Sequence, residues 1–99
     1  MIEIRSEIEF NTLINTKDIV LVDFYAPWCG PCKFLKHTLE SIEPDNIDVK
    51  FYKCNVENFT YYNIRSVPTV LIFKDGNLVD TLSGALPAKF YLDVIDKLR

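Results

Sequence analysis

The sequence predicts an α/β protein with a central mixed β-sheet and helices on both faces. In the first half, an apolar run over 19–25 is followed by a helical pattern and by a second apolar run over 49–56. This order favours a right-handed βαβ crossover. In the second half, apolar runs over 67–73 and 78–82 flank Asp75-Gly76, a pair typical of hairpin turns, and another helical pattern follows. The chain therefore predicts a βαβ unit followed by a ββα unit.

The first elements are a short strand and a helix. Ile2-Glu3-Ile4 predicts a short edge strand. Ser6 and Glu9 have the spacing of a capping box, which marks the start of a helix. That helix carries its apolar residues at helical spacing, namely Phe10, Leu13 and Ile14. Lys17-Asp18 ends the pattern before the run over 19–25, whose nearly unbroken apolar character is typical of a central strand covered on both faces.

Two later helices are predicted by residues that repeat at helical spacing. The first follows Cys32, ends at Pro44-Asp45-Asn46, and has one face made of Phe34, Leu35, Thr38, Leu39 and Ile42. Its opposite face is solvated and carries Lys33, Lys36, His37 and Glu40. Pro87 suits the first turn of the last helix. The apolar face of that helix consists of Phe90, Val94, Ile95 and Leu98.

Composition limits the possible classes of protein. The 99 residues suit a single domain, 1–99, with its own core. A formal net charge of −3 argues against binding nucleic acid, and no apolar run approaches the ~20 residues of a membrane span. The N-terminal residues do not resemble a secretory signal. Three cysteines, an odd count, argue against a secreted disulfide scaffold and favour a reducing, cytoplasmic setting.

The stretch Trp28-Cys29-Gly30-Pro31-Cys32 carries the chemistry. It follows the predicted central strand and opens a helix, whose unpaired N–H groups and positive dipole end favour an anionic sulfur. A thiolate is the form of cysteine that attacks a disulfide, and a second thiol one turn away can close on the first. The spacing therefore indicates a dithiol that cycles with a disulfide. On a helical wheel Cys29 lies opposite the apolar face and Cys32 nearer to it, so we expect Cys29 to be exposed and Cys32 to be partly buried.

Together these features resemble the thioredoxin family, over essentially the whole chain. The resemblance implies the thioredoxin fold and a protein-disulfide reductase in which Cys29 is the nucleophile and Cys32 resolves. It implies that no cofactor is bound, and that electrons come from NADPH through a flavoprotein thioredoxin reductase. The expected partners are that reductase and substrate proteins with disulfides, and we expect a monomer. Pro31 favours a reductant over an oxidant. Disulfide isomerases usually carry a histidine at this position, which would stabilise the thiolate and so make the protein a stronger oxidant.

Asp23 and Lys53 are further catalytic candidates. Asp23 interrupts the apolar strand, so we expect a buried carboxyl group with a raised pKa. By resemblance, it accepts the proton of Cys32, and Lys53 is its expected partner on the second strand. The alternatives are an aspartate that faces solvent at the strand end and an ordinary surface lysine.

The resemblance also predicts a substrate surface. Ser66-Val67-Pro68-Thr69 is similar to the family's cis-proline loop, in which the proline packs against the dithiol and the preceding backbone pairs with an extended substrate. The predicted contact residues are Trp28, Gly30, Pro31, Val67, Pro68, Thr69, Gly84 and Ala85. Each also has a purely structural interpretation, such as a core tryptophan, a strand-start proline or a turn glycine.

Three features depart from the family pattern or remain unassigned. His37 stands where the family's kinking proline is expected, and we interpret it as a surface residue. The stretch 57–64 is shorter than usual by about four residues, one helical turn, so its helix should be stunted, with Tyr61 and Tyr62 covering the gap. Cys54 is expected to be a buried thiol, although a regulatory or intermolecular disulfide is an alternative. A zinc site is not expected, because His37 faces away from the strand that bears Cys54.

Two other functions remain open. One is a disulfide oxidase or isomerase, against which Pro31 and the absent signal argue. The other is a redox-independent interaction subunit in which the dithiol is incidental.

Overall fold

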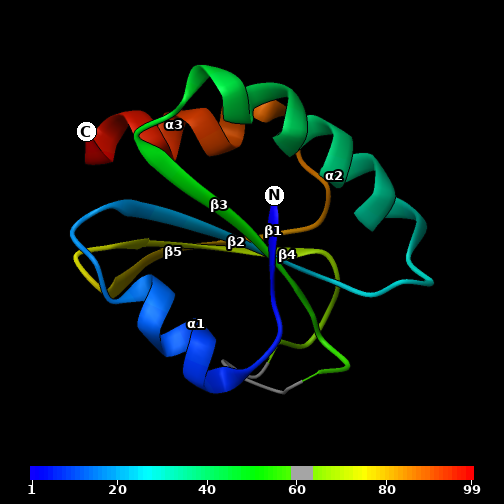
Figure 1. The fold of residues 1–99 in the computed structure, drawn as a ribbon. Coiled ribbons are helices and arrows are strands. Elements are labelled where there is room, and N and C mark those ends of the chain that lie inside the picture. Colours follow the sequence, from blue (N-terminus) through cyan, green and yellow to red (C-terminus); the bar gives the residue numbers. More distant parts are fainter. Residues whose placement is uncertain (59–63) are drawn as a thin grey trace.

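The computed structural model describes residues 1–58 and 64–99, which build a five-stranded sheet with α-helices on both faces (Figure 1). The strands are β1 Ile2–Ile4, β2 Ile19–Tyr25, β3 Val49–Asn55, β4 Thr69–Lys74 and β5 Asn77–Ser83. The helices are α1 Glu7–Ile14, α2 Gly30–Ile42 and α3 Ala88–Leu98, with a short 3-10 helix, η1, at Glu43–Asp45.

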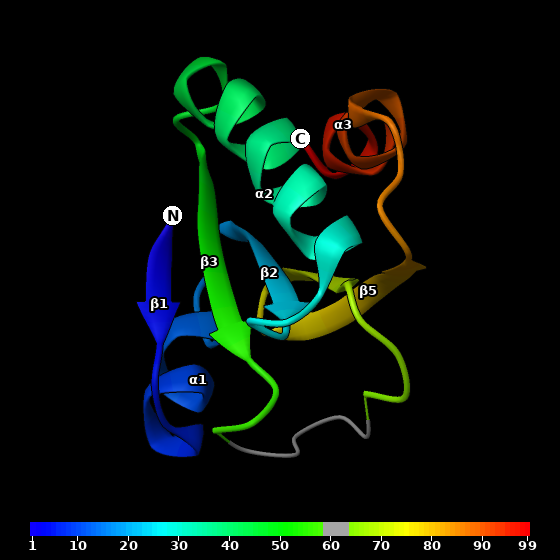
Figure 2. The ribbon, with the colours of Figure 1, turned by 90° about the vertical axis from the view of Figure 1, so that its right-hand side faces the viewer.

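The strand order is β1-β3-β2-β4-β5, which makes β2 the central strand. Strands β1, β3 and β2 are parallel, whereas β4 is antiparallel to β2 and β5 is antiparallel to β4. Helix α1 covers one face of the sheet, and α2 and α3 cover the other (Figure 2). The predicted α/β class, the mixed sheet and the short edge strand at Ile2–Ile4 are therefore confirmed.

Strand β2 is buried along nearly its whole length, as its apolar sequence predicts. Because side chains alternate between the faces of a strand, Ile19 and Leu21 pack in the core under α2 and α3, while Val20 and Val22 pack under α1. The sheet therefore separates two apolar cores, and β2 contributes to both. A strand covered on both faces leaves its carboxyl end as the place where side chains can reach the surface.

The predicted helix start and hairpin are both present. The Ser6 hydroxyl accepts the Glu9 amide at 3.1 Å, and the Glu9 carboxylate accepts the Arg5 amide at 2.8 Å. At the β4–β5 turn, Asp75 and Gly76 have φ values of 53° and 77°. The second of these favours glycine, because a side chain in that left-handed region is strained. These local signals operate as the sequence predicts.

The helical faces differ from the prediction at two aromatic residues. Phe34 is 64% exposed and Phe90 is 51% exposed, so neither belongs to a buried face. In α2 the buried stripe is Cys32, Leu35, Leu39 and Ile42. In α3 it is Tyr91 and Ile95, and the Tyr91 hydroxyl donates to the Gly84 carbonyl at 3.2 Å. A helical wheel shows how wide the apolar face of a helix is. The way the helix packs against the sheet then decides which residues at the edge of that face are buried.

Two predicted departures have different outcomes. His37 is exposed on α2, as expected. The stunted helix over 57–64 and its two tyrosines fall largely on residues 59–63, which lie outside the described residues.

Cys54 is a free thiol with no exposed surface, in the core under α1. Burial raises the pKa of this thiol to about 12, with a further contribution from the nearby Glu3 carboxylate. A thiol with so high a pKa is un-ionised at neutral pH and is therefore a poor nucleophile. Its surroundings confirm the expectation of a small buried side chain.

We predict that Cys54→Ala lowers the free energy of unfolding by about 1 kcal/mol, because it removes one buried sulfur from a packed core. The disulfide reduction expected from the sequence should stay within about twofold of the parent protein, since the thiol does not reach the surface. Urea denaturation and an insulin reduction assay measure the two quantities. A loss of activity greater than tenfold in a stable variant would contradict the packing role.

Candidate redox site

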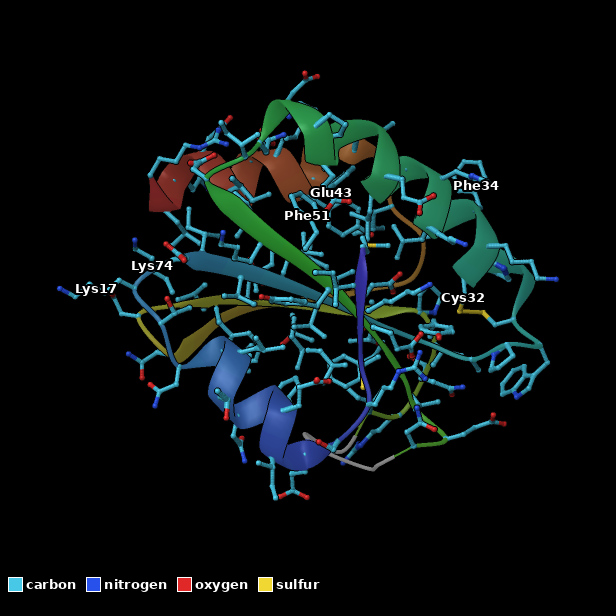
Figure 3. All side chains as sticks on the ribbon, in the orientation of Figure 1. Lys17, Cys32, Phe34, Glu43, Phe51 and Lys74 are labelled. Atoms are coloured by element: carbon cyan, nitrogen blue, oxygen red, sulfur yellow. A yellow bond between two sulfur atoms is a disulfide. The ribbon has the colours of Figure 1, made fainter. Side chains whose placement is uncertain are left out.

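The site is built where β2 leaves the sheet. Beyond Tyr25 the chain runs through Ala26, which is buried, and Trp28, which is 73% exposed, to the start of α2. Cys29 and Cys32 form a disulfide there, with their Cα atoms 5.3 Å apart. The predicted redox pair is thus joined in the structure. Figure 3 shows the yellow bond between the two sulfur atoms at the start of α2, near the label of Cys32.

Cys29 is the N-cap residue of α2. Its backbone is extended, with φ −94° and ψ 115°, and its sulfur accepts the backbone amide of Cys32 at 3.2 Å. Pro31 occupies the first turn, where its missing N–H leaves no donor unpaired. When the disulfide opens, the same amide and the positive end of the helix dipole favour negative charge on Cys29.

The predicted difference in exposure between the two cysteines is wrong. Cys29 is 5% exposed and Cys32 is 4% exposed. The wheel assumed helical geometry at Cys29, but the helix begins at Gly30 and the extended N-cap turns the Cys29 sulfur toward Cys32. Exposure therefore does not distinguish the two sulfurs, whereas the hydrogen bond to the N-cap sulfur does.

Asp23 lines the same cavity as Cys32, two residues before the end of β2. It is 2% exposed, and its Oδ1 atom has no hydrogen-bond partner. Burial raises the pKa of Asp23 to about 7, and the charge of Lys53 opposes part of that rise. The buried carboxyl group with a raised pKa is as predicted, and the solvent-facing alternative is excluded.

A cavity of about 180 Å³ connects Asp23 with the redox pair. Asp23 and Cys32 both line it, so a proton can pass between them through water molecules that a cavity of this size can hold. The complete lining is Asp23, Tyr25, Ala26, Pro27, Cys32, Lys33, Lys36 and Lys53.

Lys53 is the neighbour of Asp23 in register, on β3. Neighbouring residues of paired strands point to the same face, but no ion pair within 4.0 Å joins Lys53 to any described residue. Its ammonium group lies 5.9 Å from the ring centroid of Tyr25. The expected partnership is therefore a through-space charge effect rather than a salt bridge.

Sequence reasoning missed Tyr25 and Glu3 at this end of the sheet. The Tyr25 hydroxyl donates to the Glu3 carboxylate at 2.7 Å, and Glu3 is also the register neighbour of Lys53 on β1. Burial and this hydrogen bond raise the pKa of Tyr25. The only available signal was that Tyr25 and Asp23 share a face of β2, two residues apart.

Part of the predicted substrate surface lies beside the redox pair. The Val67–Pro68 bond is cis, and Val67 packs against the buried cluster of Ala26, Cys29 and Cys32. The Gly84 amide donates to the Pro68 carbonyl at 2.8 Å, which joins the two predicted loops. Pro68 and Thr69 are both buried, and the Thr69 hydroxyl donates to the Ser66 carbonyl at 2.8 Å.

The remaining surface candidates differ in exposure. Trp28 is not a core residue, which excludes its purely structural interpretation. Gly30 is exposed, with open space where a side chain would begin. Pro31 is exposed beside it, whereas Ala85 is half-buried and packs on the core under α3.

The described residues, 1–58 and 64–99, offer no candidate metal centre: within these ranges no group of three or more His, Cys, Asp or Glu side chains could hold a metal ion. No helix in the same ranges has the length and apolar character needed to cross a membrane.

Comparisons with known proteins agree with this geometry. The thioredoxin family model matches residues 1–97. A thioredoxin of Griffithsia pacifica is 44% identical over 90 residues, which are 86% of this chain and 83% of that protein. A thioredoxin of Mycoplasmoides gallisepticum is 41% identical over 91 residues, covering 88% of this chain and 91% of that protein. The solved thioredoxin of Fasciola hepatica superposes with a TM-score of 0.91 at 30% identity, over 100% of both chains.

The buried disulfide at a helix N-terminus, the family match and these relatives lead to one conclusion. The chain belongs to the thioredoxin family and is a protein-disulfide reductase that works by thiol–disulfide exchange.

Proposed function

We propose that the chain acts as one domain, a monomeric electron carrier of the cytoplasm. Electrons would pass from NADPH through a flavoprotein thioredoxin reductase to Cys29 and Cys32, and then to disulfides of substrate proteins. The observation that carries this proposal is the disulfide at the start of α2, flanked by Trp28 and Val67. The free thiol of Cys54 supports a reducing compartment, where unpaired cysteines persist.

Cys29 begins the reaction as the nucleophile. Its thiolate attacks one sulfur of the substrate disulfide, a mixed disulfide forms, and the other substrate sulfur leaves as a thiolate. The Cys32 amide at 3.2 Å from the Cys29 sulfur supports this assignment, since it would stabilise the attacking anion.

Cys32 resolves the mixed disulfide with Asp23 as its base. Asp23 accepts the proton of the Cys32 thiol through the shared cavity, and the new thiolate attacks the Cys29 sulfur. The substrate leaves with both sulfurs reduced, and the Cys29–Cys32 disulfide is restored. Lys53 assists by opposing the effect of burial, because its charge favours the carboxylate form of Asp23.

The substrate lies across an apolar patch beside the disulfide. We assign to that patch Trp28, Gly30, Pro31, Val67, Pro68, Thr69, Gly84 and Ala85. In this arrangement the Val67 backbone pairs with an extended substrate segment, as an added strand would. The exposed indole of Trp28 supports an apolar contact there, since it lacks cover from the rest of the chain.

The function is tested by insulin reduction with NADPH and a flavoprotein thioredoxin reductase, followed as NADPH consumption. The redox potential of the pair separates a reductant from an oxidase or isomerase, because a potential near that of thioredoxin (about −270 mV) indicates a reductant. A variant with serine in place of both Cys29 and Cys32 distinguishes the reductase from a redox-independent interaction subunit, because only the interaction subunit would keep its biological role. A potential as oxidising as those of disulfide-forming enzymes would contradict the reductase direction.

We predict opposite outcomes for the two single cysteine variants. Cys29→Ser abolishes reduction, because it removes the attacking sulfur. Cys32→Ser still attacks but cannot release the substrate, so mixed disulfides accumulate and are visible on non-reducing gels. Accumulation with Cys29→Ser instead would reverse the roles.

Asp23→Asn should slow the resolving step by about tenfold or more at neutral pH, because the amide cannot accept the Cys32 proton. Attack by Cys29 depends on the helix start and should change by less than about threefold. Rapid-quench measurement of mixed-disulfide formation and decay separates the two steps. Asp23→Glu is the matched control, since it keeps a carboxyl group in the cavity and should be less impaired. Equal slowing of both steps would contradict this role.

The difference in stability between the parent protein and Asp23→Asn should also depend on pH. The folded protein holds a proton on Asp23 up to about pH 7, whereas the ordinary pKa is 3.8. Between these values the unfolded chain binds fewer protons, so the free energy of unfolding falls as pH rises, by at most about 1.4 kcal/mol per unit, and then levels off. Asp23→Asn lacks this loss and should gain in relative stability from about pH 4 to 7. Urea denaturation of both oxidised proteins measures it, and parallel pH profiles would contradict a buried titrating Asp23.

A further inference from the structure

Four cationic side chains stand around the redox site without acidic partners. They are Lys33 and Lys36 on α2, Lys53 on β3, and Arg65 before the cis-proline. None of them takes part in an ion pair with a described residue. The sequence 59–63 holds no aspartate or glutamate that could pair with them either. We call these four residues the cationic rim.

The rim is divided between two hollows that adjoin the redox pair. The cavity of about 180 Å³ is lined by Cys32 together with Lys33, Lys36 and Lys53. A second hollow, of about 240 Å³, is lined by Trp28, Val56, Ile64, Arg65, Ser66 and Val67. Val67 also packs against the buried cluster of Ala26, Cys29 and Cys32, so the second hollow adjoins the redox pair as the first one does. A substrate chain bound at the disulfide therefore lies near the cations of both hollows.

Little negative charge lines the two hollows. Asp23 is the only acidic residue that lines either of them, and it is 2% exposed. Glu57 is exposed next to Val56 but is not among the lining residues of the second hollow. The Glu3 carboxylate accepts the Tyr25 hydroxyl. The chain as a whole carries a formal charge of −3, so the rim is a local exception on an acidic protein.

We propose that the cationic rim selects substrates whose target disulfide is flanked by aspartate or glutamate within a few residues. The proposal rests on the proposed reductase function and adds the substrate class. Complementary charges steer encounter and favour one partner over another, while the apolar patch supplies contact that does not depend on sequence. Because the rim is shared between two separate hollows next to the redox pair, acidic residues before and after the target cysteine should each contribute.

The test uses three disulfide-linked peptide dimers that differ only two residues before and after the cysteine. One carries glutamate at those positions, one glutamine and one lysine. At low ionic strength the reduced protein should reduce the glutamate peptide about tenfold faster than the lysine peptide, with glutamine between them. High salt should shrink this range, because exposed charges are screened.

Charge reversal locates the effect. Lys36→Glu combined with Arg65→Glu places one change in each hollow, at exposed positions, and should remove or reverse the preference. Lys17→Glu combined with Lys50→Glu changes net charge equally at the opposite end of the sheet, where Lys50 pairs with Val20, and should keep the preference. Figure 3 shows Lys17 on the side of the molecule away from Cys32.

Three results would overturn the proposal. Equal rates on all peptides would exclude charge selection while leaving the reductase function intact. Equal loss of preference in both double variants would assign it to net charge rather than to the rim. Failure to reduce any peptide would overturn the reductase function and this proposal with it.

Discussion

The burial of β2 on both faces governs the arrangement of the redox site. Since Ile19 to Phe24 are covered by helices above and below, only the carboxyl end of the strand meets solvent. The chain leaves the sheet there and turns directly into α2. Cys29 consequently becomes the N-cap of α2, and Asp23, still within the strand, lines the same cavity as Cys32. The extended N-cap, the amide bonded to sulfur and the buried carboxyl group all follow from where one strand stops.

Much of the fold was predictable from the sequence because its signals are local. The Ser6 cap, the Asp75-Gly76 turn and the apolar run of β2 each depend on residues close in the chain. The cis bond before Pro68 and its place beside the cysteines followed from family resemblance rather than from local physics.

The predictions were wrong or incomplete where burial and contacts depend on tertiary packing rather than on the local sequence. The helical wheel of α2 was extended to Cys29, one residue before the helix begins, and it therefore predicted an exposed sulfur where the structure has a buried one. Phe34 lies at the edge of an apolar stripe, and only the position of the sheet decides that it stays in solvent. The Tyr25–Glu3 hydrogen bond joins residues 22 apart in sequence, because β1 adds to the sheet beside β3. No periodicity within one segment could reveal it.

Helices α1 and α2 each follow the carboxyl end of a parallel strand, but their first turns differ in charge. Helix α1 has Glu7 and Glu9 in its first turn, where acidic groups stabilise a helix by about 0.3–1 kcal/mol each. Helix α2 has no acidic residue in its first turn, and Lys33 and Lys36 follow the cysteines instead. A carboxylate at that position would oppose negative charge on the Cys29 sulfur. The first turn of α2 therefore lacks the modest stabilisation that an acidic residue would give. No carboxylate in that turn offsets the positive end of the helix dipole next to the Cys29 sulfur.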